Sequence, residues 1–319
     1  PAPLQIYQEC QMSYKKNRKK PRVVNKKDVQ TCLMFIRRYG SIECNLRMAV
    51  YFGDFENILP HLLMVDNADQ RDELFVNAVY ATAVAINVYS QVYETLNIFR
   101  ETEPLVDHLW AYLVDFLDRK DILYSLEFCY TEMKRFDDLG KVHIKLFSRQ
   151  TDMTKKVFYI QNAHINFQKA LQDQIELSNS QECIIQLENL TGLQKTIFEF
   201  VIENRLSNLK ESIDIINDDE AAIYVGSLFM KFCNDQERRN DLVNTIIDIK
   251  KVHMKKIIAK LCDSYKDAPV DQLKEFLKSK KKEPHYYEYY LEQLLRLISK
   301  SEKTYHLIHP LIYFGVKSN

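Results

Sequence analysis

The stretch that decides the fold is Thr102–Gln150, TEPLVDHLWAYLVDFLDRKDILYSLEFCYTEMKRFDDLGKVHIKLFSRQ. Its apolar residues recur at intervals that place them on one face of an α-helix. The first stripe is Leu105, Leu109, Tyr112, Leu113 and Phe116. A second stripe, about 17 residues later, is Ile122, Leu126, Cys129, Tyr130 and Met133, and a third is Phe136, Leu139, His143, Leu146 and Phe147. Two helices therefore occupy about 34 residues, the period of helix-pair solenoids such as tetratricopeptide repeats.

Turn-forming residues are scarce in the rest of the chain. It has 6 Gly and 8 Pro among 319 residues, whereas a sheet protein needs many more. The hydrophobic fraction of 46% is ample for a buried core. We therefore predict an all-α chain, built as an α-solenoid of antiparallel helix pairs.

The predicted organisation has three parts. Residues 1–27 should form a short helix followed by an exposed basic linker. The like charges of the linker oppose regular structure there. Residues 28–177 should form the helix-pair solenoid. The period blurs after residue 178, so 178–319 either continue the helical repeats or form a C-terminal helical bundle that caps them.

The repeat has the tetratricopeptide period without the tetratricopeptide consensus. Val114 stands where a repeat of that family needs Gly, and Leu126 and Met133 stand where it needs Ala. Those small residues let the two helices approach closely. A peptide-clamping groove of the standard kind is therefore not expected.

The seven cysteines are scattered, odd in number and contain no CxxC pair. This favours buried thiols in a reducing compartment over a disulfide framework or a cysteine-based zinc module. The sequence contains no run of 18 apolar residues, so no transmembrane helix is predicted. The chain starts Pro-Ala-Pro, without Met or the apolar core of a signal peptide, so we expect a fragment of a longer protein.

Catalytic signatures are missing from the sequence. No two of the six glycines lie within ten residues of each other, so no Gly-rich phosphate loop can form, and GxSxG and HExxH are absent. His306 and His309 share a helical face but lack a third ligand at a recognisable spacing. His143 and His164 lie on apolar stripes and are expected to be hydrogen-bonded core or groove residues. We predict no catalytic residue, metal site, cofactor or small-molecule substrate.

Two basic segments are candidates for contact with an anionic surface or partner. The first is the N-terminal tail, which carries a net charge of +7 against −7 for the rest of the chain. Its candidate contacts are Lys15, Lys16, Arg18, Lys19, Lys20 and Arg22. The second runs from Lys250 to Lys282, where Lys251 and Lys255 are expected to share one helical face. For both segments a solvated surface is the simpler interpretation.

Tyrosines are densest at Tyr286, Tyr287, Tyr289 and Tyr290. Tyr287 should belong to a core stripe, which would leave Tyr286 and Tyr290 paired at i, i+4 towards a second surface. Such aromatic residues are common interface anchors, although they can also close the end of a solenoid. We therefore take Tyr286, Tyr290, Lys251 and Lys255 as candidate partner-binding residues.

Residues 28–171 resemble the carboxyl-terminal helical region of the spastizin family (zinc finger FYVE domain-containing protein 26). The residues that carry the resemblance are Tyr39-Gly40, Gly53, Trp110-Ala111-Tyr112-Leu113, Leu117, Arg119-Lys120, Leu123-Tyr124, Phe128 and Ile144 to Phe147. They cover less than half of the chain, and residues 178–319 are similar to the family only in being helical.

The resemblance implies a cytoplasmic scaffold at the periphery of late endosomes and lysosomes. It would work with spatacsin and the fifth adaptor-protein complex in lysosome reformation from autolysosomes. The FYVE finger that reads a phosphoinositide needs four Cys pairs, which this chain lacks, so FYVE-type lipid binding is not expected here.

Two classes of function follow from the sequence. The first is a non-enzymatic α-helical scaffold that binds proteins. The alternative is a helical-repeat nucleic-acid-binding module that uses the basic tail and the lysines between 250 and 282. A near-neutral to acidic body makes nucleic acid the less favoured partner, because phosphate neutralisation supplies most of such affinity.

Overall fold

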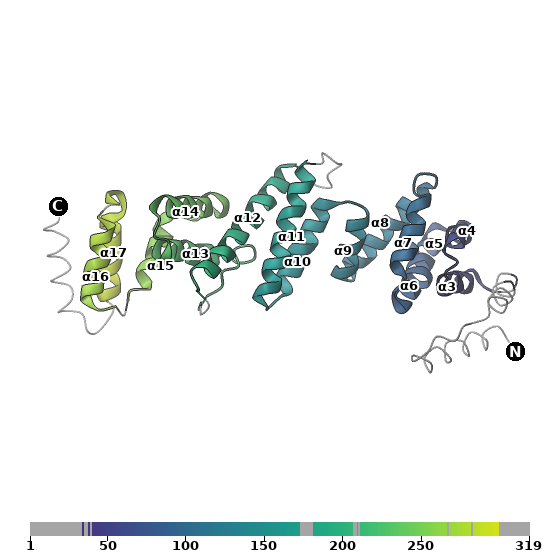
Figure 1. The fold of residues 1–319 in the computed structure, drawn as a ribbon, viewed down its shortest axis with the longest axis horizontal. Helices are drawn as coiled ribbons and strands as arrows, with labels where there is room; N and C mark the ends of the chain where they lie inside the picture. Colours follow the sequence, from purple (N-terminus) through teal and green to yellow (C-terminus); the bar gives the residue numbers. More distant parts are fainter. Residues whose placement is uncertain are drawn as a thin grey trace, which may run out of the picture. The chain divides into compact units, whose positions relative to one another are not determined.

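A computed structural model describes residues 40–172, 181–206, 209, 211–266, 268–281 and 283–299, together with Met34 and Arg38. Every regular element among these residues is helical, so the predicted all-α class is confirmed (Figure 1). The chain divides into two compact units, one ending at Ser125 and the other starting at Leu126. The solenoid arrangement remains a prediction. The predicted division at residue 177 falls outside the described residues.

The first unit consists of short helices followed by one longer helix. From residue 40 onward its helices are α3 (Ile42–Phe52), α4 (Ile58–Leu63), α5 (Ala68–Leu74), α6 (Ala81–Ile86), α7 (Tyr89–Phe99) and α8 (Pro104–Arg119). A 3-10 turn, Phe55–Asn57, precedes α4, and a π-helical stretch, Phe75–Tyr80, joins α5 to α6. Pro60 lies in the first turn of α4, where its missing N–H costs no hydrogen bond.

The core of the first unit forms around Trp110 of α8. This side chain is only 1% exposed and stacks on Tyr93 of α7, with 4.2 Å between the ring centroids. The buried stripe of α8 is Val106, Leu109, Trp110, Leu113, Val114 and Leu117. The predicted stripe also contained Tyr112 and Phe116, which are only half-buried. The buried face of α8 is therefore shifted by about one residue towards the C-terminus of the helix.

Helix α9 (Leu123–Glu132) crosses the boundary between the units, and the second unit continues with longer helices. These are α10 (Phe136–Arg149), α11 (Met153–Gln172), α12 (Gln181–Glu203), α13 (Asp219–Phe232), α14 (Gln236–Lys250), α15 (Met254–Asp263), α16 (Val270–Lys280) and α17 (Pro284–Ser299). Helix α11 packs against both α10 and α12 (Figure 1). Helices α13 to α15 pack together, and α17 packs against α15 and α16.

A glycine permits the close packing of α10 on α11. Gly140 lies on α10, and a Cβ atom added there would be 2.6 Å from the ring of Phe167 on α11. Phe167 itself is fully buried, so its ring has little room to move away. Any larger residue at position 140 therefore requires a change in the opposing helix.

Aspartate side chains cap the starts of α13 and α14. The Asp218 carboxylate accepts from the backbone N–H of Glu220 at 2.9 Å, and the Asp235 carboxylate accepts from Glu237 at the same distance. These bonds satisfy backbone donors that the first turn of a helix leaves without partners. The acidic residues near 218 and 235 are therefore helix caps.

Several helices end at a non-glycine residue with a left-handed backbone. These residues, with φ between 52° and 60°, are Asn87, Asp121, Lys134, Arg205 and Lys251. Glycine is the usual residue here because it has no Cβ to clash. Helix α3 follows the usual rule, because it ends at Gly53 with a φ of 72°.

Candidate functional site

Tyr286, one of the candidate partner-binding residues, lines an open cavity of about 340 Å³ in the second unit. Four helices contribute to it: α13, α14, α15 and the start of α17. Its lining residues are Met230, Gln236, Arg239, Asn240, Val243, Asn244, Met254, Glu283, His285 and Tyr286. Methionine and valine side chains thus meet amide, guanidinium and phenol groups. We define this cavity as the Tyr286 cavity.

Glu283 is the polar centre of the wall of this cavity. One of its carboxylate oxygens accepts from the Lys280 amino group at 3.1 Å and lies 3.5 Å from the Arg239 guanidinium. The other accepts from the Tyr290 hydroxyl at 2.9 Å. Its side chain is 20% exposed and that of Lys280 only 6%. A carboxylate with two cations and a phenol therefore joins α14, α16 and α17.

The structure corrects the prediction that Tyr290 faces a second surface with Tyr286. Tyr290 is fully buried, with its ring 5.7 Å from that of Phe276 at the centroids, whereas Tyr286 is half-buried. The buried stripe of α17 runs through Tyr287, Tyr290 and Leu294, at i, i+3 and i+7. Burial and the neighbouring Glu283 carboxylate raise the pKa of the Tyr290 phenol far above its usual value. Tyr290 is thus a core residue.

The expected lysine surface between 250 and 282 is also divided. Lys280 is buried between the rings of Phe276 and Tyr290, and Lys250 pairs with Asp219 at 2.6 Å. The Lys250 amino group lowers the pKa of the Asp219 carboxyl through that hydrogen bond. Since Lys282 lies outside the described residues, no continuous basic surface can be traced along this segment.

Lys251 and Lys255 do not share a helical face, contrary to prediction. Helix α14 ends at Lys250, and Lys251 follows in the left-handed conformation with a φ of 52°. Lys255 belongs to the first turn of the next helix, where its amino group lies 5.5 Å from the Tyr289 ring centroid. Both lysines are exposed. The chain reversal between them explains why helical spacing gave the wrong face.

Cys262 of α15 is fully buried near this cluster. Burial, assisted by the adjacent Asp263 carboxylate, raises the pKa of its thiol to about 12 from the ordinary 9.0. The folded state therefore keeps a proton that the unfolded chain loses above pH 9.0. The stabilisation is complete below pH 9.0 and is lost as the pH rises towards about 12.

We accordingly expect alkaline pH to destabilise the second unit less when Cys262 is replaced by Ala. Urea unfolding at pH 7.5 and at pH 10.5, followed by circular dichroism, measures the fall in unfolding free energy for each protein. The raised pKa of Tyr290 also makes the fold less stable at alkaline pH, but this effect is present in both proteins. Only the difference between the two falls in unfolding free energy therefore reports on the Cys262 thiol. Equal falls would show that the Cys262 thiol does not contribute.

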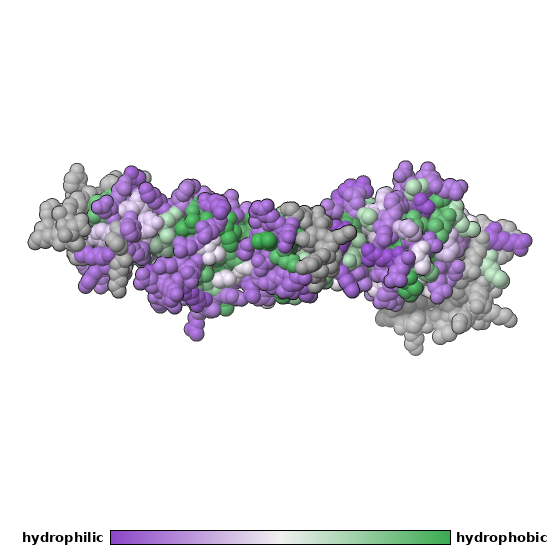
Figure 2. All heavy atoms as spheres, turned by 90° about the horizontal axis from the view of Figure 1, so that it is seen from above, coloured by the Kyte–Doolittle hydropathy of each residue, from purple (hydrophilic) through white to green (hydrophobic). Residues whose placement is uncertain are grey.

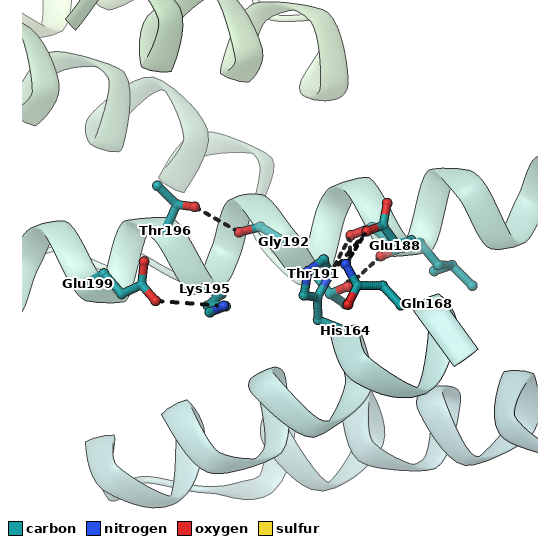
Figure 3. A network of polar contacts seen from close by, with 9 residues as sticks. His164, Gln168, Glu188, Thr191, Gly192, Lys195, Thr196 and Glu199 are labelled. Atoms are coloured by element: carbon teal, nitrogen blue, oxygen red, sulfur yellow. Dashed lines mark hydrogen bonds and ion pairs between the residues drawn. The ribbon is translucent and has the colours of Figure 1, made fainter. Parts of the chain in front are cut away.

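His143 and His164, expected to be hydrogen-bonded core or groove residues, both have hydrogen-bond partners on other helices. His143 of α10 is buried, 3.0 Å from both the Glu127 carboxylate and the Asn166 amide nitrogen. His164 of α11 lies 3.2 Å from the backbone oxygen of Glu188 on α12 (Figure 3). Its ring also packs on Gly192, where an added Cβ would be only 3.0 Å away. Both imidazoles thus connect neighbouring helices.

Other predicted residues fall outside the part of the chain that the structure describes. They include the tail residues Lys15, Lys16, Arg18, Lys19, Lys20 and Arg22, together with His306 and His309. The contact of Arg239 with Glu283 had no sequence signal, because 44 positions separate the two residues. The Lys280–Glu283 pair did have a sequence signal, because its i, i+3 spacing is typical of an ion pair on one helix. Pro284 directly after it indicates a new helix start, so the spacing alone did not predict the pair.

Among the described residues, no group of three or more His, Cys, Asp or Glu side chains is placed to hold a metal ion. In the same residues, no helix is both long enough and apolar enough to cross a membrane. Comparison of the chain with family models, curated proteins and solved structures finds no match. Membership of the spastizin family therefore stays a prediction.

Proposed function

We propose that this chain is a non-enzymatic helical scaffold that binds other proteins through the Tyr286 cavity. The composition of that cavity carries the proposal. Tyr286, Arg239 and Met254 belong to residue types that are enriched where proteins meet, and they line one concave surface. The Met230 and Val243 side chains supply an apolar floor beneath the polar groups.

The use of the polar side chains elsewhere supports a scaffold over an enzyme. His143 and His164 contact groups on neighbouring helices, and the acidic residues at 218 and 235 cap helix starts. Hydrophilic side chains cover most of the face seen in Figure 2, with apolar atoms visible between them. Groups that could serve acid–base chemistry are thus engaged in holding the helices.

The finer proposal is that the chain is the C-terminal part of a spastizin-like protein. It would then bind a spatacsin-like protein and the fifth adaptor-protein complex at late endosomes and lysosomes. The support for this is the resemblance around Trp110, Leu117 and Tyr124. The two levels of the proposal can be tested in one experiment.

Affinity capture with the full 319-residue chain tests both levels. Wild-type protein should retain spatacsin and adaptor subunits from cell lysate, and Tyr286→Ala should retain much less. Tyr124→Ala is the matched control, since Tyr124 is a tyrosine with 65% exposure in the other unit. Equal capture by all three proteins would contradict the role of the cavity, and failure to capture these partners would contradict the spastizin-like assignment.

A further inference from the structure

A second, larger cavity in the same unit is rich in positive charge. It has a volume of about 840 Å³ and lies between α13, α15 and the segment that follows α12. Its cationic side chains are Arg205, Lys231, Lys260 and Lys266, and its carboxylates are Glu211 and Asp263. Among the described lining residues, four cations against two carboxylates leave an excess of two positive charges. We define this cavity as the basic basin.

Two of the cations are held in place by neighbouring groups. The Lys231 amino group donates to the Ser264 hydroxyl at 3.3 Å and lies 5.2 Å from the Tyr265 ring centroid. The Lys260 amino group pairs with the Glu211 carboxylate at 2.7 Å. Lys231 is exposed and has no carboxylate partner among the described residues. The hydroxyl and the ring thus orient the Lys231 amino group, and its charge remains available to a ligand.

Arg205 and Lys266 complete the positive rim. Both are exposed, and no described residue forms a hydrogen bond or ion pair with either side chain. The backbone of Arg205 closes α12: its N–H donates to the oxygen of Ile202 at 3.1 Å, and the N–H of Leu206 donates to Val201 at 3.0 Å. This helix end holds the Arg205 backbone at the edge of the basin.

An apolar pocket adjoins the basin. Its volume is about 570 Å³, and it shares Arg205, Leu206, Leu209 and Glu211 with the basin as common lining. Its other apolar lining residues are Met153, Phe198, Val201, Ile202 and Ile213. A ligand that places an anion in the basin thus finds an apolar pocket directly beside that anion.

We propose that the basic basin binds a phosphorylated serine or threonine of a partner protein, with a nearby apolar side chain of the partner in the adjoining pocket. A phosphate monoester carries about −1.5 to −2 charges at pH 7 and three acceptor oxygens, which matches the excess of two cations. The exposed rim suits a segment of a larger molecule, because a small ligand is usually mostly enclosed. This proposal rests on the proposed scaffold function and names the chemistry of a partner.

Fluorescence anisotropy with the full chain tests the proposal. The probe is a labelled peptide library with one fixed phosphoserine and random flanking residues, compared with the same library containing serine. We expect the phosphorylated library to bind at least about tenfold more tightly, because charge-assisted hydrogen bonds are lost with the phosphate. Library members with an apolar residue close to phosphoserine should be enriched after capture.

The variant Lys266→Gln should weaken phosphopeptide binding about tenfold without affecting the fold, because the Lys266 side chain has no described partner. The variant Lys195→Gln is the matched control, since Lys195 is a partly exposed lysine of α12 that pairs with Glu199 (Figure 3).

Equal binding of both libraries, or equal effects of both variants, would overturn the proposal. So would displacement by inorganic phosphate at the concentration at which the free peptide competes, or binding to phosphatidylserine vesicles alone. If this test fails while Tyr286→Ala still abolishes capture, the scaffold function stands and only the basin assignment is lost.

Discussion

Replacing Glu283 by Ala should lower the unfolding free energy of the second unit by about 3–5 kcal/mol. The substitution leaves the buried Lys280 amino group and the Arg239 guanidinium without their carboxylate, and the Tyr290 hydroxyl without its acceptor. The main cost is the uncompensated charge of Lys280, whose side chain is only 6% exposed. Urea unfolding followed by circular dichroism, with hydrogen exchange of α15 to α17, measures the effect.

Two further variants separate the buried charge from the loss of packing. Lys280→Met together with Glu283→Gln removes the charge pair and keeps an acceptor for Tyr290, so most of the lost stability should return. Glu292→Ala removes an exposed carboxylate of α17, which pairs with Arg296, and should cost less than about 1 kcal/mol. If Glu283→Ala cost no more than Glu292→Ala, the buried cluster would not stabilise the unit.

Trp110→Ala should destabilise the first unit by about 3–5 kcal/mol. The indole is nearly fully buried against Tyr93, and its removal leaves a cavity that the short helices around it cannot fill. Its ring N–H has no hydrogen-bond partner among the described residues, so Trp110→Phe removes an unsatisfied donor and should cost less.

Hydrogen exchange of peptides from α7 and α8 reports the effect within the first unit. Ile98→Ala is the surface control, because Ile98 of α7 is 75% exposed, and its effect should stay within about 0.5 kcal/mol. A similar loss for Ile98→Ala and Trp110→Ala would indicate that the indole packing contributes little.

The sequence predicted the helices well because local rules govern them. Scarce glycine and proline and apolar stripes are properties of neighbouring residues, so Leu109 and Leu113 were correctly expected in the core. The exposed Ile122 shows the limit: the turn that ends at Asp121 displaced it from its predicted stripe, and α9 starts one residue later.

The candidate site was less predictable because it depends on contacts between distant residues. Tyr290 was placed on a surface because a helical wheel cannot show that Phe276 and Lys280 of α16 pack against its ring. Lys251 and Lys255 were assigned one face because no glycine or proline marked the reversal between them. Arg239 and Glu283 are far apart in the sequence, and only the packing of the helices brings them together.

The close contact of Gly140 with Phe167 has a consequence for how this chain can diverge. A side chain larger than glycine at position 140 needs the space that the Phe167 ring now fills. Relatives of this protein should therefore show correlated substitution at positions 140 and 167, with a larger residue at the first accompanied by a smaller one at the second. Such a pair in a distant sequence would mark the same crossing of α10 and α11, even where the rest of the surface has lost all similarity.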